Sequence, residues 1–240
     1  MNLFTSDIDW APEEVIADTV ELFTRYGVKC TFFCTHPSGV IDSISRDSHF
    51  ELGVHPNFMP LMNEQKGTVH DAIKKVLDLV PDAKGVRSHS LLQSTPLFQV
   101  FRDYGFLYEA NTNLPYKEDI LPYKLWNGLV KVMHNFEDDI HFMYKYDFDD
   151  CRLDLESQKL NVFSFHPIHI FLNTDAEHTY NQARPYYQNA KELLRYRNTK
   201  RKGTRDLLIE LLEQHNRRFN NQSFTVIEYL SNSNYLNGEN

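Results

Sequence analysis

The chain has 240 residues, of which 41 % are apolar and 13 % are aromatic, so it can bury a substantial core and disorder is excluded as its main state. The formal net charge is −8 with 25 basic residues, which argues against general nucleic-acid binding because that function needs a basic face. The length suits one sizeable α/β domain or two small ones.

The first half of the sequence alternates between strand-like and helix-like segments. Pro12, followed by Glu13 and Glu14, is typical of a helix start, and Gly27 is typical of its end. The pattern predicts strands at residues 2–8, 28–35, 49–55, 85–90 and 106–113, and helices at 11–27, 67–80 and 94–105.

In the second half the pattern predicts strands at residues 128–136 and 161–165, with the apolar run continuing to residue 171. It then predicts a long helix at 203–219 and a closing strand at 224–230. Two helices end in Tyr-Gly directly before an apolar strand, and such repeated units indicate a parallel sheet or barrel. Residues 173–200 are polar and could form an excursion over one face; whether they form a lid stays open.

Three cysteines are present, Cys30, Cys34 and Cys151. Their number is odd and their spacing is not that of a zinc knuckle, so we expect free thiols in a reducing compartment. The sequence begins without a basic or long apolar leader, and we therefore expect a cytoplasmic protein with no membrane span. The oligomeric state stays open.

Polar residues that bind metals or move protons follow most of the predicted strands. In parallel α/β folds the ligand site lies at the carboxyl ends of the strands. Carboxylates and imidazoles that meet there suit a mononuclear divalent metal site with open positions for water. These strand-end residues are Asp7, Asp9, His55, Arg87, Ser88, His89, Glu109, Asn111, Asn113, Glu137, Asp138, Asp139, His166 and His169.

Asp7 and Asp9 form an Asp-x-Asp pair at the end of the first predicted strand. Residues i and i+2 of a strand share a face, so both carboxylates would point into one pocket. If one binds the metal and the other stands beside its water, the pair supplies a ligand and a general base. The structural alternative is a surface turn with two solvated aspartates before a helix.

The order of motifs "SDIDW", "ELGVH", "GVRSHS" and "FSFHP" resembles the polysaccharide deacetylase superfamily, the NodB-type carbohydrate esterases. The resemblance covers about residues 3–170 and is closest to divergent members of bacterial surface-polysaccharide synthesis. It implies an α/β fold, a distorted and incomplete (β/α) barrel, with residues 1–240 as one catalytic domain.

The resemblance also implies roles for individual residues. Asp7 would be the catalytic base, oriented by Arg87, and His166 the general acid. Asp9 and His55 would bind the metal, and Asp138 in "FEDD" would tune His166. For the substrate we expect contacts from Trp10, Ser88 and His169, although Trp10 could equally be a core residue, and His169 would face away from His166 on a regular strand unless Pro167 bends the chain.

The sequence departs from the family pattern after His55, where a second histidine normally follows four residues later. Met59 stands there instead. His89 is our candidate for the third ligand, because it lies two residues after Arg87. His36 and the weaker oxygen donor Asn57 are the alternatives, and His89 could instead hydrogen-bond substrate or backbone.

The implied reaction is hydrolysis of an N-acetyl group on an amino sugar, with one divalent metal ion as cofactor, Zn²⁺ by ligand type. We expect an acetamido-sugar substrate that is nucleotide-linked or lipid-linked, and formyl amides stay open. Two other classes remain: a related hydrolase acting on a small non-sugar amide or ureide, and a non-catalytic carbohydrate-binding module that has lost the metal.

Overall fold

The computed structural model describes residues 1–150 and 159–236. Cys151 lies outside the described residues. Cys30 and Cys34 are buried free thiols, as the sequence predicts. No helix within the described residues has the length and apolar character needed to cross a bilayer.

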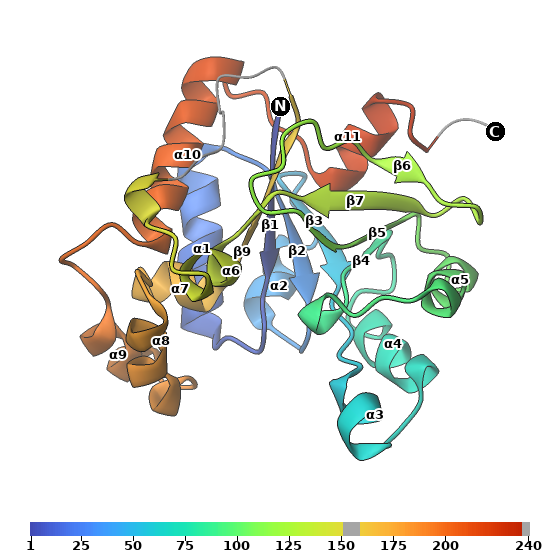
Figure 1. Cartoon of the computed structure of the whole chain (residues 1–240), viewed down its shortest axis with the longest axis horizontal. Coiled ribbons are helices and arrows are strands. Elements are labelled where there is room, and N and C mark those ends of the chain that lie inside the picture. The colour runs from blue at the N-terminus through green and yellow to red at the C-terminus, as the bar shows by residue number, and fades with distance from the viewer. Residues whose placement is uncertain (151–158, 237–240) are drawn as a thin grey trace.

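The core of the fold is a nine-stranded sheet with the strand order β6-β7-β5-β4-β3-β2-β1-β9-β8. All neighbouring strands are parallel except the β6/β7 pair. The sheet curls into a half-barrel (Figure 1), which confirms the expected distorted, incomplete (β/α) barrel. The strands are β1 (Asn2–Asp7), β2 (Cys30–Cys34), β3 (Phe50–Val54), β4 (Gly85–Val86), β5 (Tyr108–Asn113), β6 (Tyr123–Lys124), β7 (Val130–His134), β8 (Phe136–Glu137) and β9 (Asn161–Phe165).

Helices cover the outer face, and α1 packs against α7 and α10. The Tyr-Gly endings predicted from sequence recur at Gly27 and Gly105, whose φ angles of 62° and 86° are left-handed. The helices are α1 (Glu13–Tyr26), α2 (Gly39–Ile44), α3 (Met59–Glu64), α4 (Val69–Leu77), α5 (Thr95–Asp103), α6 (Asp138–Met143), α7 (Pro167–Leu172), α8 (Glu177–Ala183), α9 (Ala190–Leu193), α10 (Thr204–Phe219) and α11 (Val226–Asn232), with 3-10 turns η1 (His89–Leu91), η2 (Phe148–Asp150), η3 (Arg184–Tyr186) and η4 (Leu194–Tyr196).

Successive side chains of a strand point to opposite faces of the sheet, and this alternation separates two hydrophobic cores. Phe32 of β2 packs into the large core beneath the helices, whereas Phe33 packs into a smaller core on the other face with Tyr108 and Leu3. Residues two apart on β1 share this second face, so the apolar Leu3 is followed by Thr5 and then Asp7. The interior of the half-barrel therefore changes from apolar to polar towards the carboxyl ends of the strands.

The predicted closing strand at residues 224–230 is wrong: this segment forms helix α11. The hydroxyl of Thr225 accepts the N–H of Glu228, and the Glu228 carboxylate accepts the N–H of Thr225, which together form a capping box. Val226 and Leu230, four residues apart, are buried in the smaller core. The β-branched residues suggested a strand, but this cap and spacing favour a helix.

One predicted strand is much shorter than expected, and another ends where expected but leads directly into a helix. β4 contains only Gly85–Val86, and η1 begins three residues later, at His89. β9 ends at Phe165, and α7 begins at Pro167, a residue favoured at the first position of a helix. Both changes of direction occur at the carboxyl ends of strands, so they place polar residues at the same end of the half-barrel.

Candidate metal and active site

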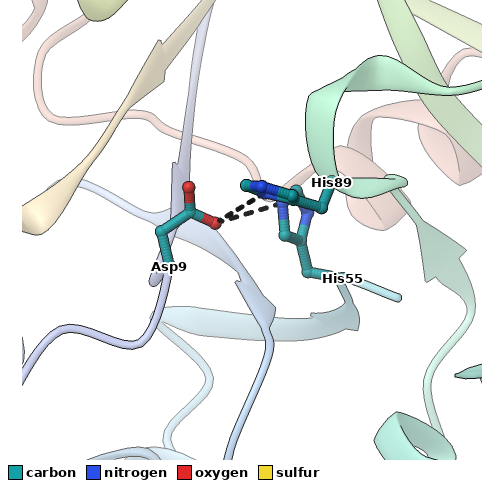
Figure 2. A group of neighbouring side chains, drawn as sticks. All are labelled: Asp9, His55 and His89. Atoms are coloured by element: carbon teal, nitrogen blue, oxygen red, sulfur yellow. Dashed lines mark ion pairs between the residues drawn. The ribbon is translucent and has the colours of Figure 1, made fainter. Parts of the chain in front are cut away.

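Asp9, His55 and His89 come together at the carboxyl ends of β1, β3 and β4 (Figure 2). The carboxylate Oδ1 of Asp9 lies 3.2 Å from Nε2 of His55 and 3.5 Å from Nδ1 of His89. One ligand atom from each residue lies within 4.8 Å of the other two. The structure thus brings together the three residues that the sequence suggested as metal ligands.

Asp9 reaches this position through a turn and not through the regular strand expected for Asp-x-Asp. β1 ends at Asp7, and both Asp9 and Trp10 have positive φ angles, 36° and 57°. A non-glycine residue in this region costs about 1–3 kcal/mol and persists only where neighbouring contacts impose it. The i,i+2 argument therefore does not hold for Asp9, although Asp7 and Asp9 still lie close enough for their charges to interact.

The donor set fits a divalent metal ion. Oδ1 of Asp9 is buried and makes no hydrogen bond within the described residues, although two imidazole nitrogens face it. Burial opposes ionisation, but His55 and His89 outweigh it and hold the pKa of Asp9 well below its usual range. A charged oxygen and two nitrogens that converge without a bridging hydrogen bond suit Zn²⁺ or another first-row ion.

The two alternatives for the third ligand are engaged elsewhere. His36 uses both ring nitrogens, Nδ1 with the hydroxyl of Thr35 at 2.9 Å and Nε2 with the carbonyl of Ala11 at 3.1 Å. The side-chain oxygen of Asn57 accepts the N–H of Met59 at 2.9 Å. His89 is therefore better placed than either residue to complete the group.

Asp7 is held by the buried Arg87. Nη1 of Arg87 donates to Oδ1 of Asp7 at 2.9 Å, and to the hydroxyls of Thr5 and Ser164 at 3.0 and 2.9 Å. The guanidinium also lies 4.4 Å from the ring centroid of Phe33. Burial would raise the pKa of Asp7, but Arg87, with smaller contributions from His55 and His166, lowers it.

Within the described residues, the second oxygen of Asp7, Oδ2, makes no hydrogen bond. The carboxylate is thus ionised and fixed through Oδ1, while Oδ2 keeps its lone pairs. This arrangement suits a group that accepts a proton.

His166, directly after β9, is paired with Asp138 at the start of α6. Nδ1 of His166 lies 2.7 Å from Oδ1 of Asp138, and its backbone N–H donates to Oδ2 at 2.9 Å. Burial opposes protonation, but Asp138 and Asp139 outweigh it and hold the pKa of His166 well above its usual value. Nε2, on the other side of the ring, lies 3.8 Å from Asp9. A protonated imidazole in this position can donate a proton from Nε2.

A second group, Glu137, Asp139 and His166, also has ligand atoms within 4.8 Å of one another. It fits a metal less well, because Nδ1 of His166 is engaged by Asp138 and Oε2 of Glu137 lies 2.9 Å from Nε2 of His134. Burial raises the pKa of Asp139 to about 6, which also disfavours the charged form.

A cavity of about 550 Å³ opens beside the cluster, and a smaller one of about 240 Å³ is lined in part by His55. Trp10 lines both, so it is a wall and not a core residue, and its ring meets that of His89 edge-on at 5.1 Å. The larger cavity is lined by Asp9, Trp10, His89, Asp139, Phe142, Met143, His166, Ile168, His169, Glu177, Tyr180, Asn181, Arg184, Tyr187 and Gln188.

Of the other two expected substrate contacts, His169 lines a cavity and Ser88 does not. His169 lines the larger cavity because α7 turns it to the side of His166, with 5.6 Å between ring centroids. Burial lowers the pKa of His169 to about 4, so it is neutral. Ser88 has no exposed surface and lines neither cavity, since its N–H is held by the side chain of Asn111. Ser88 is therefore placed to support the turn to His89, and a substrate contact at Ser88 stays a prediction.

Sequence reasoning missed the cavity residues between 177 and 188. Tyr180, Arg184 and Tyr187 come from the polar excursion and reach the site from far along the chain. Apart from the dense aromatic and polar composition of the segment, nothing in their local pattern distinguishes them from other surface residues.

Comparisons with known proteins identify the family of the chain. The family model of WbmS-like polysaccharide deacetylases matches residues 4–184. A crystal structure from Bordetella bronchiseptica, described as a polysaccharide deacetylase involved in O-antigen biosynthesis, is 36 % identical over 89 % of this chain and 90 % of that one, with a TM-score of 0.82. A comparison with curated proteins finds no match.

Two more distant structures share the fold alone. A polysaccharide deacetylase from Mycobacterium smegmatis is 14 % identical over 97 % of this chain and 88 % of that one, with a TM-score of 0.55. A 4-α-glucanotransferase from Thermococcus litoralis is 13 % identical over 96 % of this chain and 38 % of that one, with a TM-score of 0.52. On the family match and the Bordetella structure together, the chain belongs to the WbmS-like polysaccharide deacetylases.

Proposed function

We propose that this protein is a metal-dependent hydrolase that removes an N-acetyl group from an amino sugar of bacterial surface-polysaccharide synthesis. The observation that carries the proposal is the convergence of the Asp9 carboxylate with His55 and His89, beside an Asp7 carboxylate whose pKa Arg87 lowers. The description of the Bordetella protein supports the type of pathway.

Asp9, His55 and His89 would hold the ion, for which we propose Zn²⁺. When bound, such an ion acts as a Lewis acid and lowers the pKa of water towards about 7. Oδ2 of Asp7 is free to accept a proton from the attacking water, while Arg87 keeps the carboxylate ionised and fixed.

His166 would complete the reaction as general acid. The water oxygen bonds to the acetyl carbon, the C–N bond breaks, and Nε2 of His166 gives its proton to the leaving amine. Asp138 holds Nδ1 of the same ring, which fixes its orientation and favours the protonated form before the transfer. The products are acetate and a free amino sugar.

The 550 Å³ cavity is the proposed site for the sugar, and its volume lies within the usual range of small-molecule pockets. Trp10 and Tyr180 offer aromatic faces, and Asn181 and Arg184 offer hydrogen-bond donors. Neutral His169 can hydrogen-bond a hydroxyl or the amide. These groups suit a polar ring that carries an acetamido group.

The proposal is tested by metal analysis of protein purified without chelators, followed by assays of acetate release from a panel of acetamido sugars. We expect one divalent ion per chain and acetate release from at least one sugar. His89→Ala should lose most of the metal, whereas His49→Ala, which changes an exposed histidine paired with Asp47, should keep it. A metal-free wild type would favour a non-catalytic carbohydrate-binding module, and a metal-loaded protein that hydrolyses only non-sugar amides would replace the substrate class.

A further inference from the structure

Two side chains from the polar excursion hold the turn that carries Asp9. The hydroxyl of Tyr187 donates to the backbone carbonyl of Asp9 at 2.7 Å, and Nε2 of Gln188 donates to the carbonyl of Trp10 at 2.9 Å. In each case the partners are 178 residues apart. Consecutive side chains thus bind consecutive carbonyls of the metal-site turn.

This turn needs support, because both of its central residues, Asp9 and Trp10, have positive φ. Two other hydrogen bonds help to hold it. The N–H of Trp10 donates to the hydroxyl of Thr35 at 3.1 Å, and the N–H of Ala11 donates to the carbonyl of Ile8 at 2.8 Å. Of these contacts, the one from Tyr187 acts directly on Asp9. Without it, the Asp9 peptide can rotate towards ordinary backbone angles and turn its carboxylate away from the two imidazoles.

The segment that supplies the two side chains is itself fixed. The N–H of Tyr187 donates to the carbonyl of Arg184 at 3.2 Å, and the side chain of Asn189 accepts the N–H of Glu192 at 3.2 Å, which caps α9. Leu193 of α9 has no exposed surface. The Tyr187 hydroxyl is therefore presented from an anchored backbone.

We propose that Tyr187, assisted by Gln188, is a positioning residue that keeps the Asp9 carboxylate in place for a divalent metal ion. The inference rests on the metal centre of the proposed function and adds a residue that acts through Asp9 without touching the ion. Because Tyr187 also lines the larger cavity, one side chain contacts both the sugar pocket and the metal-site turn.

The test compares Tyr187→Phe, which removes only the hydroxyl, with Tyr186→Phe as a matched control. Tyr186 is the preceding residue, and its ring stacks on Tyr196 with 5.3 Å between centroids. Zn²⁺ affinity is measured by competition with a chromogenic chelator, the Co²⁺ form is examined by visible absorption, and the melting temperature is measured without metal.

We expect Tyr187→Phe to weaken Zn²⁺ binding by about 10-fold to 100-fold, the range for residues that orient a metal ligand, and to alter the Co²⁺ spectrum. Gln188→Ala should give a smaller loss, and Tyr186→Phe should bind Zn²⁺ as the wild type does. The metal-free melting temperature of Tyr187→Phe should stay close to that of Tyr186→Phe, which separates positioning from general destabilisation.

Wild-type Zn²⁺ affinity in Tyr187→Phe would overturn the inference, as would an affinity loss matched by an equal loss in Tyr186→Phe. A wild type that binds no Zn²⁺ would overturn it together with the metal centre. A wild type that binds Zn²⁺ but releases no acetate from any sugar would overturn the proposed function alone.

Discussion

Asp7 and Asp9 are two residues apart, yet they lie in opposite environments. Asp7 is on a regular strand, and its Oδ1 is fixed by the fully buried Arg87. Asp9 is in a left-handed turn, and its Oδ1 faces two imidazoles without a hydrogen bond. The guanidinium of Arg87 balances the Asp7 carboxylate within the fold. The nearest partners of the Asp9 carboxylate are the imidazoles of His55 and His89, which are also metal-binding groups. Environment, and not residue type, separates a proposed base from a proposed ligand.

The largest effect that tests this comparison is expected from Asp7→Asn. An amide cannot accept the proton from water, so turnover should fall by about 10²-fold to 10⁴-fold, the usual contribution of a general base. Metal content should stay at the wild-type level, because Asp7 is paired with Arg87 and is not in the ligand group. Acetate release and metal analysis on the same sample check both statements. Loss of metal in Asp7→Asn, with metal kept in Asp9→Asn, would show that the two aspartates have exchanged roles.

The reciprocal variant, Asp9→Asn, should lose the metal. Removing the charged oxygen leaves two imidazoles, and we expect Zn²⁺ affinity to fall by at least about 100-fold, since even residues that only orient ligands cost 10-fold to 100-fold. Chelator competition measures this change. Unchanged affinity in Asp9→Asn would exclude Asp9 from the metal site and end the contrast with Asp7.

Asp139 extends the comparison to a third carboxylate. Burial raises the pKa of Asp139 to about 6. The folded protein then holds this proton more tightly than the unfolded chain does, so stability should decrease as the pH rises from about 4 to about 6. The ionisation of Asp139 alone should lower the free energy of unfolding by at most about 3 kcal/mol.

Asp139→Asn should remove that part of the pH dependence. The difference in free energy of unfolding between variant and wild type, measured by urea denaturation in the presence of a chelator, should favour the variant above pH 6 and shrink towards pH 4. A difference that does not change with pH would show that Asp139 titrates normally.

The smallest effect on stability is expected from α11, at the end of the half-barrel opposite the proposed metal site. Thr225→Ala removes the cap of α11 and should lower the free energy of unfolding by about 1 kcal/mol. Zn²⁺ affinity should not change, because α11 covers the apolar end of the interior and is not part of the site. A fall in metal affinity would show that the two ends are coupled and would weaken the view that local contacts define the site.

Several site residues could be found from the sequence because each comes just after an apolar strand. His55 follows β3 and His166 follows β9, and the carboxyl ends of parallel strands meet at one edge. His89 was found from the absence of a histidine at position 59. The structure brings His89 to Asp9 at the start of the 3-10 turn η1, two residues after Arg87.

Other features could not be read from local pattern. The positive φ of Asp9 is imposed by contacts that include Tyr187, 178 residues away, and a pairing of that range leaves no periodic signal. Ser88 occupies a strand end yet is fully buried, because the chain turns directly after it. Helix α11 is different: the sequence Thr-x-x-Glu at Thr225–Glu228 is a readable capping box, although the β-branched residues around it also fit a strand.

Within residues 1–150 and 159–236, the sheet of this incomplete barrel ends at two edge strands, β6 and β8, whereas a closed barrel has no edge. Each of these strands is only two residues long, and β6 carries Lys124 beside Tyr123. Short and charged edges offer an incoming chain few backbone groups for pairing. The half-barrel therefore leaves its sheet unclosed without presenting a long template for edge-to-edge aggregation.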